Sequence, residues 1–162
     1  MAYVNLAIAY HDSGHYSAAV TALEEALSID DVDWLAWGNL AFVYAHKNGL
    51  DQQTIDTFEK AIELAEDARK QYPRDPFVHS DLAMYYATTD QPELAIQRLE
   101  TALTLSPNSG EVAAAAAEAY ETIGQREKAL VLLKTALDLG YSMRRLQSNN
   151  ALDELMLDPR MQ

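Results

Sequence analysis

One short pattern recurs along this chain and constrains its fold more than any other feature. The sequence Leu-Ala-x-x-Tyr occurs at residues 6–10, 40–44 and 82–86, and a weaker copy, Ala-Ala-x-x-Tyr, occupies residues 116–120. The tyrosines Tyr10, Tyr44, Tyr86 and Tyr120 are 34, 42 and 34 residues apart. Self-similarity at such a period predicts a stack of repeats, each of which buries its apolar face against its neighbours.

Each repeat has the pattern of two amphipathic helices joined by a short turn. The Leu-Ala-x-x-Tyr residues share one face of the first helix. An apolar stripe at spacings of four and three marks the second helix, in the sets Ala19, Leu23, Ala26; Thr54, Phe58, Ala61; Ala95, Leu99, Ala102; and Ala129, Leu133, Ala136. We expect left-handed glycines to end the first helix at Gly14, Gly49 and Gly124. In the third repeat, Pro92 suits the first turn of the second helix.

These features together resemble the tetratricopeptide repeat, over roughly residues 1–140. The small-residue pairs, the tyrosine, the turn glycine, the second-helix stripe and the closing Pro107 all match that family. Trp37 also stands three residues before Leu40, where the family often has tryptophan. The resemblance implies an all-α, right-handed solenoid of four helix-turn-helix repeats with one or two capping helices. We expect a single domain, with repeats at 1–31, 32–73, 74–107 and 108–141 and a tail at 142–162.

Two departures from the repeat pattern carry further predictions. The 42-residue interval places seven extra residues after Ala61, which is two helical turns, so we predict one long helix from Gln52 to about Tyr72. The tail contains apolar residues typical of short helices that cover the last repeat, namely Met143, Leu146, Leu152, Leu155 and Leu157. Residues 153–160 resemble the ends of bacterial multidomain signalling proteins. Because the helical pattern also begins at Met1 without a cap, we expect a fragment of a longer chain.

The composition narrows the classes of partner. A formal net charge of −13, from 25 acidic and 12 basic residues, disfavours nucleic acid and favours Lys- or Arg-rich proteins, although solubility alone also accounts for it. No apolar run approaches the roughly 20 residues that span a bilayer, and no signal-peptide pattern is visible, so we expect a cytoplasmic protein without a membrane partner.

Catalytic and metal-binding patterns are missing from the sequence. The absence of cysteine excludes disulfides and thiolate metal sites, and there is no phosphate-binding glycine loop, G-x-S-x-G elbow or H-E-x-x-H motif. His11 and His46 both follow a repeat tyrosine closely and are expected to approach each other, but no third ligand is specified. We therefore predict neither an enzyme, nor a cofactor, nor a metal site.

The resemblance also implies a binding surface, because the first helices of this family line a concave groove. Counted from the Leu-Ala pair, the groove positions are Met1, Val4, Ile8, His11; Leu35, Gly38, Phe42, Ala45; Phe77, Ser80, Met84, Ala87; and Glu111, Ala114, Glu118, Glu121. Directly before the pair stand Asn5, Asn39 and Asp81, where asparagines of peptide-binding relatives hold the peptide backbone. The groove is thus apolar in its middle and acidic at its fourth-repeat end. The alternative is that Phe42 and Phe77 only pack between repeats.

The function that follows is noncatalytic recognition of a protein segment with large apolar side chains and a lysine or arginine. The peptide-binding residues that we predict are Asn5, Ile8, Leu35, Asn39, Phe42, Phe77, Asp81, Met84, Glu111, Glu118 and Glu121. Two alternatives stay open. One is a regulatory module that acts on a kinase, cyclase or transcription-regulator domain of its own chain. The other is self-association through the uncapped first repeat.

Overall fold

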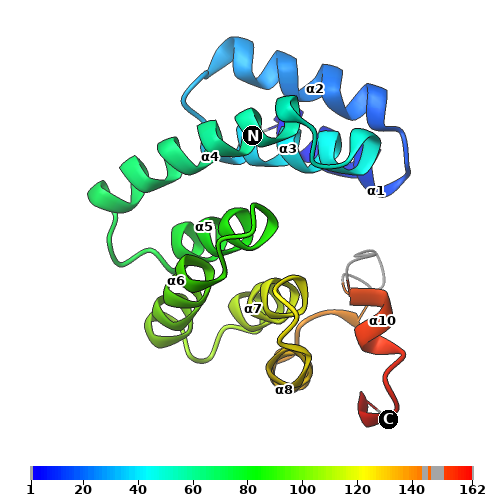
Figure 1. Ribbon diagram of the computed structural model, residues 1–162, viewed down its shortest axis with the longest axis vertical. Coiled ribbons are helices and arrows are strands. Elements are labelled where there is room, and N and C mark those ends of the chain that lie inside the picture. Colours follow the sequence, from blue (N-terminus) through cyan, green and yellow to red (C-terminus); the bar gives the residue numbers. More distant parts are fainter. Residues whose placement is uncertain (1, 144–145, 147–151, 162) are drawn as a thin grey trace. The chain divides into compact units, whose positions relative to one another are not determined.

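The computed structural model describes residues 2–143, 146 and 152–161, and within these residues every regular element is a helix (Figure 1). The expected all-α fold is therefore confirmed. The chain divides into two compact units, Met1–Ala68 and Arg69–Gln162.

The first unit is built from helices α1 (Ala2–Asp12), α2 (Tyr16–Ile29) and α3 (Trp34–Asn48) and most of α4 (Gln52–Gln71). Helices α1 and α2 pair as a hairpin, and α3 packs against both of them. The core of this packing consists of Val4, Ala7, Ala19, Ala22, Leu23, Ala26, Ala36, Leu40 and Val43. Helix α4 joins α3 through an edge-to-face contact between Phe42 and Phe58, whose ring centroids are 5.1 Å apart. The predicted long helix is confirmed.

The second unit contains α5 (Pro76–Thr88), α6 (Pro92–Leu105), α7 (Gly110–Thr122) and α8 (Arg126–Asp138), followed by the short elements α10 (Asp153–Met156) and η2 (Pro159–Met161). Helices α5 and α6 form one hairpin, α7 and α8 form another, and α7 packs on α5 and α6. Both α10 and η2 contact α8, as expected for a capping tail, while Met143 and Leu157 of that tail are exposed.

The first helix of the hairpin ends in the same backbone turn in three of the repeats. The carbonyl oxygens of Tyr10, Tyr86 and Tyr120 each accept a hydrogen bond from the backbone N–H five residues later, at 2.8 Å. This bond requires a left-handed residue between its partners. Gly14 and Gly124 supply that conformation with φ of 74° and 75°, and Asp90 supplies it in the third repeat with φ of 58°. The turn predictions for both glycines are confirmed.

The second-helix stripes are buried in all four repeats, as predicted. The first helices obey the pattern less evenly. Leu40 and Leu82 are 4% and 0% exposed, whereas Leu6, at the same position of the first repeat, is 44% exposed. Ala7 is 1% exposed, so the helix face that Leu6 and Ala7 are predicted to share is buried at Ala7 and open at Leu6.

Candidate functional site

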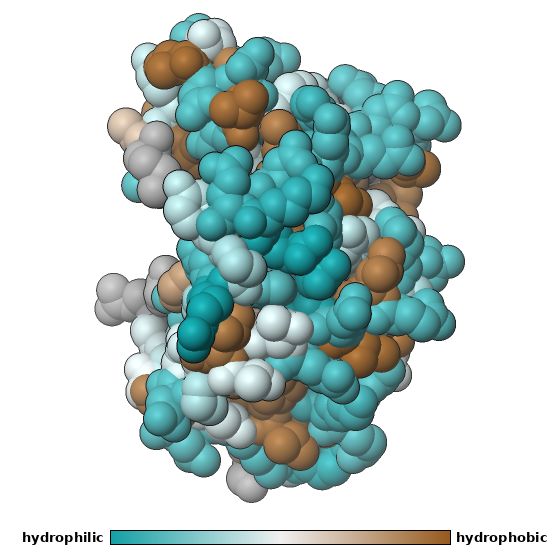
Figure 2. Space-filling view, turned by 90° about the vertical axis from the view of Figure 1, so that its left-hand side faces the viewer, coloured by the Kyte–Doolittle hydropathy of each residue, from teal (hydrophilic) through white to brown (hydrophobic). Residues whose placement is uncertain are grey.

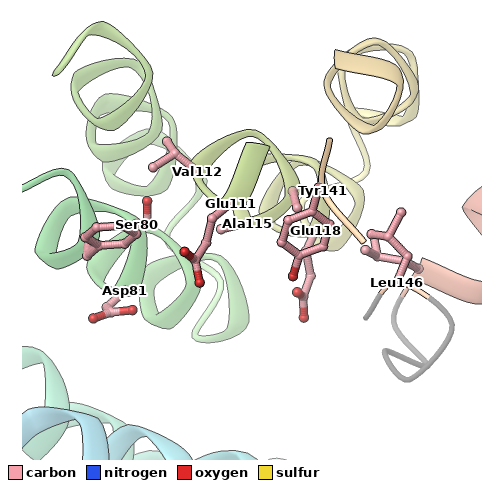
Figure 3. Close-up of a pocket in the computed structure, with 11 residues that line it drawn as sticks. Ser80, Asp81, Glu111, Val112, Ala115, Glu118, Tyr141 and Leu146 are labelled. Atoms are coloured by element: carbon pink, nitrogen blue, oxygen red, sulfur yellow. The ribbon is translucent and has the colours of Figure 1, made fainter. Parts of the chain in front are cut away.

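The second unit contains a cavity between α5, α7 and the segment after α8 (Figure 3). Its volume is about 210 Å³, and its lining residues are Phe77, Ser80, Asp81, Glu111, Val112, Ala114, Ala115, Glu118, Tyr141, Leu146 and Leu152. Four of the predicted peptide-binding residues, Phe77, Asp81, Glu111 and Glu118, thus line one cavity. Met84 of α5 is half-buried and does not line it.

The helical register explains why carboxylates gather at this cavity. Glu111, Ala115 and Glu118 follow one another at spacings of four and three, so they share one face of α7. Figure 3 shows the carboxylates of Asp81, Glu111 and Glu118 projecting toward the same side of the two helices. The rest of the lining is mainly apolar. Such a site combines an apolar floor with a negative rim, an arrangement that suits a long side chain with a cationic end.

Glu121 lies elsewhere, although the sequence groups it with the other two acids of α7. Its carboxylate forms an ion pair with Arg126, and its side chain is 18% exposed. Arg126 also donates to Asp158 Oδ2 at 3.3 Å and to the Glu154 carbonyl at 2.8 Å. Glu121 therefore belongs to the contacts that hold the tail rather than to the cavity rim.

Among the lining residues that the sequence analysis did not name as peptide-binding, three lie outside α5 and α7, namely Tyr141, Leu146 and Leu152. All three belong to the segment after α8. The apolar pattern of the tail predicted that it covers the last repeat, and that pattern is the signal that could have pointed to them. It could not show that the covering residues also form a wall of a cavity.

The first unit presents a separate row of predicted residues. Asn5 and Ile8 are exposed on α1, and Leu35, Asn39 and Phe42 are half-buried on α3. Asn39 Nδ2 donates to the carbonyl of Leu35 at 2.7 Å, so that this amide donor is engaged within its own helix. A contact of Asn39 with a peptide backbone would use Oδ1 as acceptor or the second N–H of Nδ2 as donor.

Several positions that the family register places in a groove are buried instead. Val4 is 4% exposed and is part of the first-unit core, so its predicted groove role is wrong. Gly38, Ser80, Ala87 and Ala114 are likewise buried, whereas Met1 lies outside the described residues. Small side chains at these positions let neighbouring helices approach closely, although Ser80 and Ala114 still line the cavity of the second unit.

The expected approach of His11 and His46 is confirmed. His11 Nε2 lies 3.1 Å from His46 Nδ1, and the ring of Tyr16 stacks on that of His46. Within the described ranges, no group of three or more His, Asp or Glu side chains is arranged to hold a metal ion.

The surface is in keeping with the charge of the chain. On the face drawn in Figure 2, hydrophilic residues cover most of the area and hydrophobic residues form separate patches. None of the helices in the described part is both long enough and apolar enough to cross a bilayer.

Comparisons with known proteins agree with this architecture. Three family models, each described as a tetratricopeptide repeat, match residues 2–33, 35–108 and 87–142. Curated protein sequences contain no significant match.

Among solved structures, the chain is similar to TTC0263, a thermophilic TPR protein of Thermus thermophilus, with 25% identity and a TM-score of 0.62 over 96% of this chain and 80% of that chain. It is also similar to MamA of RS-1, with 16% identity and a TM-score of 0.50 over 98% and 85% of the two chains, and to MamA of AMB-1, with 24% identity and a TM-score of 0.43 over 86% and 98%. From the repeated hairpins, the backbone turn that three of them share and the three family matches, the chain belongs to the tetratricopeptide-repeat family.

Proposed function

We propose that this chain is a noncatalytic protein-recognition module whose ligand is a peptide segment with a large apolar side chain beside a lysine or arginine. The observation that carries the proposal is the cavity of the second unit, where Phe77 lies with Glu111 and Glu118 around an apolar floor. The aliphatic stem of a lysine or arginine packs on apolar surface while its charged end reaches a carboxylate. The family is one of protein-interaction scaffolds, which supports recognition as the general role.

The first unit offers a second surface for such a segment. Ile8 is 40% exposed on α1, and Phe42 is half-buried on α3 beside Asn39. We assign to this surface contacts with apolar side chains and with peptide backbone. A rigid scaffold limits the entropy that binding costs, and an affinity in the micromolar range, about −8 kcal/mol, is expected.

Fluorescence anisotropy with labelled peptides tests the proposal. The peptides pair leucine or phenylalanine with lysine or arginine, and each has a matched peptide in which glutamate replaces the basic residue. The basic peptides should bind more tightly than their glutamate-substituted partners. Added salt should weaken the binding of the basic peptides, because it screens exposed charges. The variant E111Q/E118Q should bind the basic peptides about tenfold more weakly.

Two further variants separate charge from shape. E100Q replaces a single glutamate in the same way at an exposed position of α6 outside the cavity, and it should leave the affinity unchanged. A115L fills the cavity, so it should weaken binding while the remaining affinity keeps its salt dependence. Equal binding of basic and glutamate-substituted peptides, or an unchanged affinity of E111Q/E118Q, would refute the proposal.

A second candidate role, self-association through α1, is favoured by one observation. Leu6 and Tyr3 are 44% and 41% exposed, whereas Leu40, the counterpart of Leu6 in the next repeat, is buried in the first-unit core.

A further inference from the structure

A pair of histidine rings joins α1 to α3 in the first unit. His11 Nε2 and His46 Nδ1 are 3.1 Å apart, and the two rings meet edge to face with centroids 4.6 Å apart. His46 Nδ1 also lies 3.0 Å from the carbonyl oxygen of Phe42, one helical turn earlier. His11 Nδ1 lies 3.5 Å from a carboxylate oxygen of Asp12.

These distances determine which ring nitrogens carry protons in the neutral pair. A carbonyl oxygen only accepts hydrogen bonds. His46 Nδ1, which lies beside the Phe42 carbonyl, must therefore carry a hydrogen and donate it. That N–H is shared between the Phe42 carbonyl and His11 Nε2, which must then be an unprotonated acceptor. The proton of neutral His11 therefore sits on Nδ1, on the side of Asp12.

We propose that the hydrogen bond between His46 Nδ1–H and His11 Nε2 is a pH-sensitive link between α1 and α3, called here the histidine fastening. The bond forms while His11 is neutral and breaks when His11 is protonated. His46 offers only its Nδ1–H donor to His11, so the contact depends on an acceptor at His11 Nε2. Protonation of His11 converts the Nε2 acceptor into a donor. Two N–H groups then face each other, and the hydrogen bond is lost.

The surroundings of His11 favour its neutral form. Burial lowers the pKa of His11, and the nearby His46 lowers it further, whereas the hydrogen bond and the charge of Asp12 oppose the shift. Helix α2 contributes Tyr16, whose ring centroid lies 5.6 Å from that of His11. Since the folded state resists protonation of His11, its contribution to stability is fully present above the ordinary histidine pKa of about 6.5 and is lost as the pH falls below it.

The histidine contact lies next to predicted peptide-binding residues of α1 and α3. Ile8 precedes His11 by three residues on α1, and Phe42 precedes His46 by four on α3, so each lies on the same helix face as its histidine. The inference does not depend on peptide recognition, however, because it concerns only the contact between the two helices.

Tryptophan fluorescence provides a selective test. The two tryptophans of the chain, Trp34 and Trp37, both lie on α3, so their emission reports on the first unit. Urea unfolding should be followed from about pH 8 to about pH 5, the range in which histidines titrate. The wild type should lose stability below about pH 6.5, by about tenfold in the folding equilibrium constant for each unit by which the pKa of His11 is lowered.

The variant H11Q removes the titration and keeps an acceptor, since the amide oxygen of glutamine can accept from His46 Nδ1. Its stability should fall less than that of the wild type over the same pH range. H15Q is the matched control, because His15 is exposed and its ring contacts Ser13 at 3.1 Å. H15Q should follow the wild type. Equal pH dependence of H11Q and the wild type would overturn the inference.

Nitrogen-15 NMR of the histidine rings is an independent test. It uses only the wild type, so its result does not depend on whether a variant folds. At neutral pH, Nδ1 of both His11 and His46 should carry the proton. His11 should titrate below the ordinary pKa of about 6.5. A proton on His11 Nε2 at neutral pH, or a His11 titration at or above the ordinary value, would contradict the fastening.

Discussion

At the scale of single residues, Gly110 shows how closely the two ends of the α7–α8 hairpin approach. A Cβ atom built at this position would lie 3.1 Å from the carbonyl oxygen of Ala136 and 3.2 Å from Cβ of Tyr141. The first of these neighbours is backbone in the last turn of α8, so it has little freedom to move. We expect G110A to lower the free energy of unfolding by about 1–2 kcal/mol, more than any gain in helix propensity. Urea unfolding followed by circular dichroism measures this change.

Gly124 is the matched comparison, since a Cβ there meets no atom within 4 Å but the backbone has φ of 75°. Its cost upon substitution comes from conformation rather than from collision. G124N should therefore be less destabilising than G124A, because asparagine tolerates the left-handed region. At Gly110 asparagine should be no better than alanine. The same order of stability at both positions would contradict this distinction.

Residue-level prediction succeeds where the contact partner lies within the repeat pattern. The stripe residues of the second helices are buried in every repeat, as their helical spacing predicts. Prediction fails at Val4, because the position that the family register places in the groove is part of the core packed between α1, α2 and α3. The sequence analysis also did not predict the ion pair of Glu121 with Arg126. Arg126 contacts Asp158 and the Glu154 carbonyl of the tail, and the sequence pattern does not show these long-range contacts.

At the scale of elements, α4 and the tail mark the two limits of sequence reasoning. Helix α4 follows from periodicity, because seven inserted residues preserve its apolar stripe through Ala65 and Ala68, both of which are buried. The tail has no such period. Its position is set by long-range contacts, notably the burial of Leu152 and Leu155 and the ion pairs of Asp158. The cavity wall that the tail provides could therefore not be predicted.

Asp158 joins the tail to α8. It is 9% exposed and accepts hydrogen bonds from Arg160 Nε at 2.8 Å and Arg126 Nε at 3.3 Å. The hydrogen bonds from Arg160, with a smaller contribution from Arg126, lower the pKa of Asp158 well below its ordinary value. The lowered pKa means that the contribution of Asp158 to stability is present above about pH 4 and is lost as the pH falls further.

The variant D158N should loosen the tail at neutral pH, because both guanidinium groups lose their shared counter-charge. Hydrogen exchange of the backbone amides in residues 152–161 should become faster, while exchange in α5 and α6 stays the same. D138N, at an exposed position at the end of α8, is the control and should leave the tail unchanged. Unaltered exchange of residues 152–161 in D158N would show that the charge of Asp158 does not hold the tail.

At the scale of the whole molecule, the repeats of this chain indicate what the outer face of α1 can bind. Trp37, Leu40 and Tyr44 of α3 pack against the core formed by α1 and α2. The residues in the same register on α1 are Tyr3, Leu6 and Tyr10, of which Tyr3 and Leu6 are exposed. A face that matches a packed surface in the next repeat is suited to contact another helical hairpin, and a second copy of the chain provides one.

Self-association through this face predicts a specific response to substitution. The molar mass measured by light scattering should rise with protein concentration in the wild type. L6E should abolish the rise, because a charge then faces the contact. V131E is the control, since Val131 is 65% exposed on α8 in the other unit, and it should associate like the wild type. Val4 is unsuitable for this test because it is buried, so a charge there would unfold the first unit. Association that persists in L6E would place the self-contact on another face, whereas a constant mass in the wild type would leave peptide recognition as the role that the exposed surfaces of this chain support.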